Sequence, residues 1–356
     1  MAEPNIPSIK SIAAEAGVSV STVSRVLNTP EKVNPAMRER VEAAIRRNNY
    51  RPNPSAQGFR RKSTGIYGAL LPHYRTESFS KLLSGAVSEA AKTGRSILLS
   101  EPYDDLEQEK NAISNLIDKP LDGLMYLPRS TGYDIPRIDY FKDIPIVGLS
   151  RRHISFASAC VTSDNRQSGY LAAQYLLRLG RRDLIFVAAV QPGSGIESVA
   201  QLEQVAHSSE AGAYAAADRY LGFRQALSEA GVDYDPQRVL IGEFRRTGGI
   251  ETGQRILSCP GPIDGVVAAS DMTAAGIISV LQGQGIDVPG EISVVGCNDD
   301  SLSSLYFPSI TTIRHDSERM GRLAVQMLND LCTGKPVQSV MTGVTLVARE
   351  STTRKR

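Results

Sequence analysis

The stretch IKSIAAEAGVSVSTVSRVLN, Ile9 to Asn28, decides how the N-terminal part of this chain folds. Ser8 precedes apolar residues at helical spacing and can cap the first turn of a helix. Gly17 can end that helix, because a residue without a Cβ takes the left-handed conformation at little cost. Ser19 then caps a second helix that runs to about Leu27. These signals predict two short helices joined by a tight turn.

The second helix has one face that can pack and one face that is open to a partner. Val23, Val26 and Leu27 share the apolar face, because residues three and four apart lie side by side on a helix. A helix-turn-helix places the first residues of its second helix against base edges in the major groove, where Arg can bond a guanine in two places. An amphipathic helical hairpin without this role has the same spacing. The candidate DNA-contacting residues of this helix are Ser19, Val20, Ser21, Thr22, Arg25 and Asn28.

A third helix and an extended stretch follow. Asn34 and Pro35 form an N-cap and a first helical position, and Val41 and Ala44 can cover the first two helices. Residues 51–60 are typical of a restrained extended segment followed by a short helix. Through GVSVSTVSRVLN and NNYRPNPSA, the chain resembles the LacI/GalR family of bacterial transcription regulators.

Charge is divided unevenly along the chain. Residues 1–62 carry 11 Lys and Arg against 5 Asp and Glu, a net charge of +6, whereas the remainder carries 29 against 33, a net charge of −4. A basic segment attracts phosphate and makes binding strongly salt-dependent, while an acidic body is repelled by the duplex. Because the basic segment coincides with the two-helix pattern, the charge supports a nucleic-acid role.

Length and composition indicate a small head and one or two larger domains. No apolar run in the 356 residues approaches the length of about 18 that spans a bilayer. The N-terminus lacks a secretion signal, and the 4 cysteines show neither close pairing nor metal-ligand spacing. We therefore expect a cytoplasmic protein without a membrane partner, in which each cysteine is a small buried apolar residue.

From about Gly65 onward, apolar runs of strand length alternate with amphipathic helices. Strand, helix, strand repeated in this way implies parallel sheets with helices on both faces, and so many strands imply two sheets. Ligands of such sheets bind beyond the carboxyl ends of the strands. The expected strands are Tyr67–Leu71, Ser96–Ser100, Leu124–Leu127, Ile146–Leu149, Leu184–Val187, Val239–Gly242, Val266–Ala269 and Ile292–Gly296. The expected helices are near Phe79–Thr93, Glu107–Ile117, Arg166–Leu179, Arg219–Ala230, Gly248–Leu257, Thr273–Gln282 and Ser317–Leu331.

The resemblance covers nearly the whole chain. The family pattern of Arg, two residues, Gly and an aromatic is present as RYLGF at 219–223, and ASDMTAAG, VPGEISVVG, FPSITTIRHD and VARES also match. The resemblance implies an α/β body like a periplasmic sugar-binding protein: two lobes, each with a parallel doubly wound sheet, joined by three crossovers. The crossovers are expected near Ser163 to Asn165, near His315 to Ser317 and near Gly343. The implied domains are a helix-turn-helix head at 1–52, a hinge helix and linker at 53–64, and a body at 65–356, with an N-lobe at about 65–164 and 317–343 and a C-lobe at about 165–316 and 344–356.

The resemblance also implies that a small effector binds between the lobes. Arg219 resembles the family arginine that clamps polar oxygens of the effector, a role suited to its fixed fork of donors, and a surface salt bridge is the alternative. Phe79 and Phe244 stand where the family places apolar side chains against the effector, although each can equally be a core residue. Asp271 can contact the effector, support lobe closure or simply cap a helix, and Asp164 at the first crossover is a further candidate.

Asn298 departs from the family pattern. The family carries Asp at this place in Gly-aromatic-Asp-Asp, where this chain has GCND at 296–299. An Asp accepts hydrogen bonds from two sugar hydroxyls, whereas Asn donates and accepts and carries no charge. The usual neutral sugar is therefore in doubt, and an anionic or otherwise substituted ligand is favoured. Arg151, Arg152 and His315 support the same expectation, unless they are solvated charges.

A second departure lies between Val190 and Ala217, where the chain is longer than the family connection by roughly twenty residues. Long loops in compact domains are functional or mobile. The segment can form a lid beside Arg219, be disordered or contact a partner, and the sequence favours none of these.

A third departure lies in the linker. In the family, a linker helix forms only on DNA, and a pair of leucines wedges into the minor groove and bends the duplex. Phe59 holds the leucine position here and follows Gly58, and Ala56 is a further candidate DNA contact. Gly costs helix stability ~1 kcal/mol relative to Ala, so we expect linker folding to depend tightly on DNA. Packing of Phe59 against the body is the alternative.

Patterns typical of enzymes are missing from the sequence. There is no GxGxxG after a strand, no GxxxxGK[ST], no HExxH and no GxSxG, and the 4 histidines are scattered. We therefore predict no catalytic residue, metal or cofactor. The expected protein is a sequence-specific regulator, a homodimeric repressor of a pseudo-palindromic double-stranded operator, controlled by a sugar or sugar derivative. The alternative is a cytoplasmic small-molecule binding protein with a vestigial head.

Overall fold

The computed structural model describes residues 7–50, 63–71, 76–101, 106–127, 144–152, 154, 157–190, 195–208, 212 and 214–355. The chain divides into two compact units, Met1–Thr64 and Gly65–Arg356. The first unit is the head and the second is the body. Ala56 and Phe59 lie outside the described residues.

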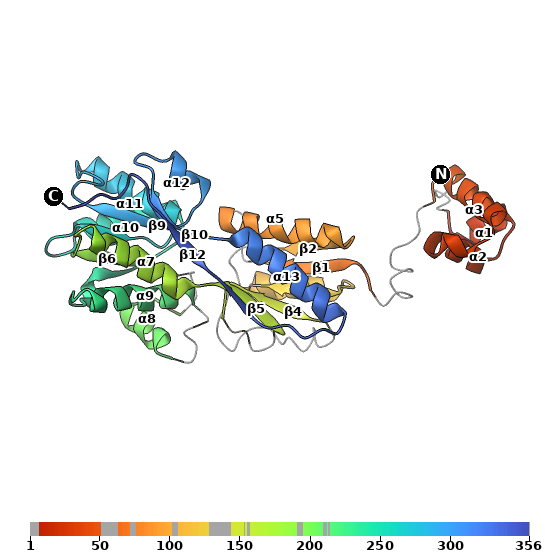
Figure 1. Ribbon diagram of the computed structural model, residues 1–356, viewed down its shortest axis with the longest axis horizontal. Coiled ribbons are helices and arrows are strands. Elements are labelled where there is room, and N and C mark those ends of the chain that lie inside the picture. The colour runs from red at the N-terminus through yellow and green to blue at the C-terminus, as the bar shows by residue number, and fades with distance from the viewer. Residues whose placement is uncertain are drawn as a thin grey trace. The chain divides into compact units, whose positions relative to one another are not determined.

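Residues 7–50, the described part of the head with residues 63 and 64, form three helices and one short 3-10 turn, and the three helices are labelled in Figure 1. Ser8 accepts a hydrogen bond from the Ser11 amide at the start of the first helix, and Gly17 ends that helix at φ 62°. Ser19 caps the second helix and Asn34 caps the third, so the caps predicted from the sequence are confirmed. The elements are α1 (Ile9–Ala16), α2 (Val20–Asn28), η1 (Pro30–Lys32) and α3 (Pro35–Arg47).

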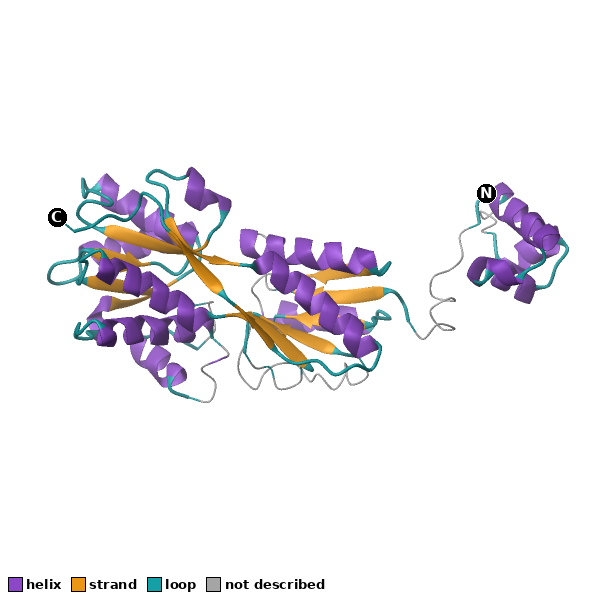
Figure 2. Ribbon diagram, viewed as in Figure 1, coloured by secondary structure: helices purple, strands orange, loops and turns teal. Residues whose placement is uncertain are grey.

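The body contains two six-stranded sheets, each with helices on both faces (Figure 2). The first sheet has the order β11-β5-β4-β3-β1-β2, and with its helices we call it the N-lobe. Helices α5 and α13 cover one face and α6 the other. The N-lobe elements are β1 (Ile66–Leu70), α5 (Glu77–Lys92), β2 (Ser96–Ser100), α6 (Leu106–Ile117), β3 (Gly123–Tyr126), β4 (Ile146–Leu149), β5 (Ala159–Ser163), α13 (Ser317–Cys332) and β11 (Val340–Thr342).

The second sheet repeats this arrangement in the order β12-β10-β9-β8-β6-β7, and with its helices we call it the C-lobe. Helices α7, α8 and α9 cover one face, and α10 and α11 cover the other. The C-lobe elements are α7 (Asn165–Arg178), β6 (Leu184–Ala189), α8 (Val199–Ala206), α9 (Ala215–Glu229), η4 (Pro236–Arg238), β7 (Val239–Gly242), α10 (Arg246–Leu257), β8 (Gly265–Val267), α11 (Asp271–Gly283), β9 (Ser293–Asn298), α12 (Ser301–Leu305), β10 (Thr311–His315) and β12 (Val344–Val347).

The chain passes between the two sheets three times: after β5, after β10 and after β11. Strands β5, β10 and β11 all end at these passages, so the carboxyl ends of the strands in both lobes meet at the junction of the lobes. Strand β12 starts at the junction instead of ending there, and it therefore pairs antiparallel with β10. The predicted fold class is confirmed, but the second sheet is mostly rather than wholly parallel.

Part of the long segment between Val190 and Ala217 is folded. Residues 199–206 form helix α8, in which Leu202 and Ala206 are buried against the C-lobe core. The Glu203 carboxylate accepts hydrogen bonds of 2.7 Å from both Tyr220 and Tyr234. The alternative of disorder is therefore wrong for residues 199–206, since buried apolar contacts and hydrogen bonds hold this helix in place.

Candidate DNA-reading helix and candidate effector site

The first helix of the head positions the second through a small apolar core. Ile12, Ala16, Val23, Val26 and Val41 are all buried in this core, which joins the three helices. The opposite side of α2 is open to solvent, as a helix that enters a major groove requires. The predicted packing of α2 is confirmed.

The exposed residues of α2 differ in how freely their side chains can reach a base. Val20, Ser21 and Arg25 are exposed on its first two turns. Thr22 is half-buried, and its hydroxyl hydrogen-bonds Ser19 Oγ at 2.9 Å. Asn28 is exposed and donates to the Ser24 carbonyl oxygen of its own helix at 2.7 Å. The Ser21 hydroxyl also hydrogen-bonds Ser19 Oγ, at 2.7 Å. The exposed side chains of Val20 and Arg25 are therefore the best placed to read bases.

Arg40 on α3 holds the C-terminal end of α1 through hydrogen bonds to its backbone. Its Nη2 donates to the carbonyl oxygens of Ala16 and Gly17, which are left without partners at the end of α1. A Cβ at Gly17 would lie 2.5 Å from Arg40 Nη2, so glycine serves both the left-handed turn and this contact. The turn between α1 and α2 thus depends on a residue far along the sequence.

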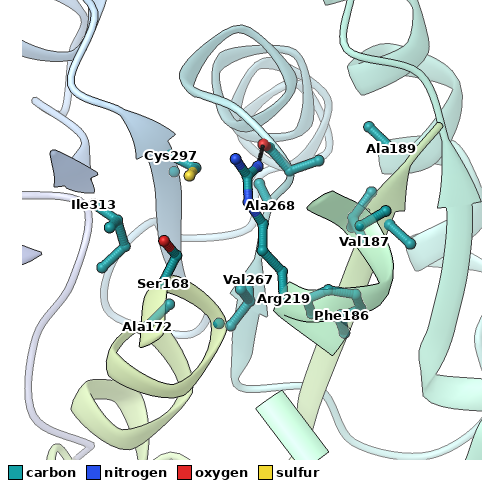
Figure 3. A pocket seen from close by; sticks show the side chains of 15 residues that line it. Ser168, Ala172, Phe186, Val187, Ala189, Arg219, Val267, Ala268, Cys297 and Ile313 are labelled. Atoms are coloured by element: carbon teal, nitrogen blue, oxygen red, sulfur yellow. Dashed lines mark hydrogen bonds between the residues drawn. The ribbon is translucent and has the colours of Figure 1, made fainter. Parts of the chain in front are cut away.

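Arg219 lies on α9 beside a small hollow at the carboxyl ends of the C-lobe strands (Figure 3). Its Nε donates to Asn165 Oδ1 at 3.0 Å, and its Nη1 donates to the Ala269 carbonyl oxygen at 2.9 Å. Both acceptors are uncharged, and Arg219 forms no ion pair with any described residue. The alternative of a surface salt bridge is therefore wrong for the described part of the chain. Ser168, Cys297 and Arg219 carry the polar side-chain atoms of this lining, and the other side chains in it are apolar, from alanine to Phe186.

His315 and Cys297 form a second part of the same region. His315 Nε2 lies 3.2 Å from Cys297 Sγ and 3.4 Å from Ser168 Oγ. Burial, together with the nearby positive charge of Arg219, lowers the pKa of His315 to about 3. Burial raises the pKa of Cys297 to about 11. Both side chains are neutral near pH 7, so the alternative of His315 as a solvated charge is wrong.

Asp271 lies inside the C-lobe. Its carboxylate accepts hydrogen bonds from Thr312 Oγ1 at 2.5 Å and from the Asp300 amide at 2.8 Å. Burial raises its pKa to about 7. The alternative of Asp271 as an N-cap is wrong, because the preceding Ser270 accepts the hydrogen bond from the Thr273 amide.

Asn298 is the last residue of β9 and has a positive φ of 113°. Burial raises the pKa of the neighbouring Asp300 to about 6, and hydrogen bonds from Ser78 and Asn298 lower it in part. An aspartate at position 298 would place a second carboxylate beside Asp300, whereas an amide can donate a hydrogen bond to it. Asn298 therefore has a local hydrogen-bond partner in the C-lobe.

The other predicted effector residues lie elsewhere in the body. Phe79 on α5 packs against the N-lobe core, and Phe244 is half-buried with its carbonyl oxygen accepting from Ser270 Oγ. Asp164 caps α7 by accepting from the Gln167 amide at 2.9 Å. Arg151 is partly buried near Tyr126, Glu109 and Tyr214, and burial lowers its pKa. None of these four predicted side chains lines the hollow beside Arg219.

Hydrogen bonds and an ion pair join the lobes at two places. Arg152 Nη2 lies 2.6 Å from Asp218 Oδ1, which links the loop after β4 to α9. Arg152 is therefore paired and is not a simple solvated charge. Glu77 on α5 accepts from the Ser301 amide and hydroxyl at 2.7 and 2.8 Å. In Figure 1, α5 and α12 lie above the junction and α9 lies below it, so the lobes are held from both sides.

Family models match both parts of the chain. The model described as "Bacterial regulatory proteins, lacI family" matches residues 8–53, and the model described as "Periplasmic binding protein-like domain" matches residues 173–352. The chain is 31% identical over 347 residues to the HTH-type transcriptional regulator RegA of Clostridium saccharobutylicum, covering 97% of this chain and 99% of the relative. The chain belongs to the lacI family of bacterial regulatory proteins.

Further relatives agree with this membership. The chain is 29% identical to the HTH-type transcriptional repressor CytR of Escherichia coli (strain K12), with 93% of this chain and 91% of the relative covered. A solved lac repressor bound to ONPG in the repressed state has a TM-score of 0.81 at 25% identity, covering 97% and 99% of the two chains. A solved complex of the transcriptional regulator CelR with cellobiose has a TM-score of 0.69 at 26% identity, covering 97% and 99%. This lacI-family protein is thus a DNA-binding transcriptional regulator, as the sequence predicted.

The structure of this lacI-family regulator adds residues that the sequence did not single out. Asn165, Ser168 and Ala269 lie close to Arg219 in the fold. All three are distant from Arg219 in the sequence, and Ala269 contributes only its backbone carbonyl oxygen. Asn165 directly follows the first crossover, which was the one sequence signal available for it. Within the described residues, no group of three or more His, Cys, Asp or Glu could hold a metal ion, and no helix is long and apolar enough to cross a membrane.

Proposed function

We propose that this lacI-family regulator is a homodimeric repressor of a pseudo-palindromic operator, and that a small molecule bound between its lobes controls its affinity for DNA. The observation that carries the proposal is the position of Arg219. Its guanidinium is bonded to Asn165, directly after the first crossover, and to Ala269, just past the carboxyl end of β8. Open α/β sheets bind ligands at this end of their strands.

Arg219 retains donors for a ligand. A guanidinium has about five N–H donors, and the hydrogen bonds to Asn165 and Ala269 use one on Nε and one on Nη1. No described residue accepts a hydrogen bond from Nη2. A ligand with oxygens in the plane of the guanidinium, such as a carboxylate, a phosphate or a pair of sugar hydroxyls, fits this arrangement.

We infer that the effector is a sugar derivative, with an anionic group favoured. Asn298 brings no charge to the C-lobe strand ends, and Arg151 adds a partly buried positive charge, whereas the charge of Arg152 is balanced by Asp218. Phe79, Asp164, Phe244, Asp271 and His315 remain candidate contacts in this proposal. Asp164 and Asp271 already accept hydrogen bonds within the protein, so we rank them below Arg219.

The dimer is inferred from exposed apolar side chains of the C-lobe. Leu305 and Phe307 are each 82% exposed, although large apolar residues this open are costly in water. A second copy of the chain would cover them, and a two-fold dimer would set the spacing of two operator half-sites. We place this regulator in the bacterial cytoplasm, where operator DNA is accessible, and assign it no catalytic activity.

A thermal-shift screen with a matched arginine control tests the effector site. The full chain and its Arg219→Ala and Arg178→Ala variants would be screened with sugars, sugar acids, sugar phosphates and purines, since a ligand that binds only the folded state raises the melting temperature. Arg178 is exposed in the last turn of α7, away from the hollow. We expect a ligand that stabilises the parent and Arg178→Ala but not Arg219→Ala. The affinity of that ligand for each protein would then be measured by calorimetry. Equal affinities of the parent and of Arg219→Ala would show that Arg219 does not bind the effector.

A further inference from the structure

Asn165 joins the candidate effector arginine to the first crossover between the lobes. Its Oδ1 accepts from Arg219 Nε at 3.0 Å, and its Nδ2 donates to the Ser163 carbonyl oxygen at 3.3 Å. Asn165 is the first residue of α7, directly after the crossover, and it is only 6% exposed. A buried amide that is both donor and acceptor therefore connects Arg219 to the segment about which the lobes can turn.

The same segment is bonded to the third crossover. The Asp164 amide donates to the Thr342 carbonyl oxygen at 2.9 Å, just before the chain passes into β12. A displacement of Asn165 would therefore also displace two of the three chain segments that connect the lobes. The described contacts form one continuous path from Arg219 through Asn165 and Asp164 to Thr342.

The helices that carry this path are packed backbone to backbone. A Cβ at Gly169 on α7 would lie 1.9 Å from the carbonyl oxygen of Arg219, and a Cβ at Gly222 on α9 would lie 1.9 Å from that of Arg166. Helices α7 and α9 therefore have little room to slide against each other. The side chain of Arg219, rather than its backbone, is the part that can respond to a ligand.

We propose that Asn165 is a positioning residue: it fixes the orientation of the Arg219 guanidinium and couples that guanidinium to the first crossover. The effector then binds a guanidinium that is already oriented. A displacement of that guanidinium is transmitted to the first crossover through the side-chain amide of Asn165. This inference rests on the proposed function, because it takes Arg219 to be the residue that binds the effector.

The first test observes Arg219 directly in the ligand-free full chain. The ¹⁵N NMR signal of Arg219 Nε–H is assigned by its loss in Arg219→Lys and followed in Asn165→Ala and Asn165→Asp. We expect Asn165→Ala to shift the signal toward that of a solvated arginine and to speed its exchange with water by about tenfold, as expected for loss of a hydrogen bond to a charged donor. Asn165→Asp keeps an oxygen acceptor and should retain the protected signal. Asn329→Ala removes an amide that accepts from Tyr67 in the N-lobe, and it should leave the signal unchanged.

The second test measures coupling to the crossover. Hydrogen exchange at the Asp164 amide should quicken in both Asn165→Ala and Arg219→Lys, and the double variant should be no faster than the faster single variant, because both changes break one link. A multiplicative effect in the double variant would show independent roles and would overturn the proposal. An unchanged Arg219 signal in Asn165→Ala would do the same. If Asn165→Ala does not fold, loss of the protected signal in Asn165→Asp would contradict the proposal.

Both tests use ligand-free protein. An absent effector response in the thermal-shift screen would therefore count against the proposed function and leave the positioning role of Asn165 to be judged by these measurements alone.

Discussion

Arg25 stands one turn beyond Ser21 on the exposed side of α2, and it is the longest side chain that this part of the helix offers to a base. Arg25→Ala should remove a base-edge contact and cost ~1 to 3 kcal/mol of discrimination between operator and other DNA. Footprinting on the operator and on a scrambled site measures this difference.

The control for Arg25 removes the same charge elsewhere in the head. Arg46 is exposed in the last turn of α3, so Arg46→Ala should weaken binding to both DNA sequences alike. If Arg25→Ala changed neither operator affinity nor sequence preference, α2 would not be the reading helix.

Asp271 makes the stability of the C-lobe depend on pH. Its folded-state pKa of about 7 lies above the ordinary value of 3.8, so folding takes up a proton between these two values. The contribution of Asp271 to stability is therefore greatest below that window and declines as the pH rises through it. Asp271→Asn should flatten the parent's loss of stability between pH 4 and 7, measured by urea unfolding at several pH values. A ¹³C carboxyl titration of Asp271 with a midpoint near 4 would contradict this account.

Among the elements of the chain, the linker gives a prediction about DNA bending. Phe59 lies outside the described residues, and its role as a minor-groove wedge is an expectation from the family pattern. An inserted ring must unstack a base step, a cost of a few kcal/mol that contacts with bent DNA offset, and flexible pyrimidine–purine steps deform most readily. Phe59→Ala should weaken specific binding and reduce the bend, while non-specific affinity changes little. Circular-permutation gel shifts measure the bend, and an undiminished angle in Phe59→Ala would rule out the wedge.

Elements with local signals could be predicted from the sequence. The head helices carry their own caps, and the expected strands of the body match β1 to β4 and β6 to β9 to within a few residues, because buried parallel strands are continuous apolar runs. Six further elements carry no clear local pattern in the sequence and were not predicted: β5, β10, β11, β12, α8 and α12. Strand β10 reads TTIRH and β11 has only three residues, so neither has an apolar run. Pairing with a neighbouring strand, rather than local pattern, makes these segments strands.

The candidate site was less predictable than the fold. Arg219 was found through its motif, whereas its partners Asn165 and Ala269 become neighbours only when α7, α9 and β8 pack together. The sequence predicts His315 as a ligand contact or a solvated charge, because the sequence alone does not show the burial that lowers the pKa of this side chain to about 3. Interactions between distant segments therefore account for most of what the sequence left open.

In the whole molecule, the links between the lobes at these two places should respond together, because both restrain the same movement of one lobe against the other. Arg152→Ala breaks the link to Asp218 on one side of the junction, and the amide of Ser301, bonded to Glu77, reports on the other side. Loss of ~1 kcal/mol of lobe contact should speed exchange of the Ser301 amide by about threefold to tenfold. Arg322→Ala, which breaks an ion pair with Glu318 within α13 alone, is the control. Faster exchange confined to the neighbours of Arg152 would show that the lobes move independently of this link.

We predict that this lacI-family regulator reads a two-fold symmetric operator. The most direct measurement is selection of genomic fragments by the purified full chain, with excess non-specific DNA as competitor, in parallel with Arg25→Ala. We predict a small set of enriched fragments sharing a near-palindromic motif with a pyrimidine–purine step at its centre, lost in Arg25→Ala. No enrichment over Arg25→Ala, the result expected of a small-molecule binding protein with a vestigial head, would contradict the account.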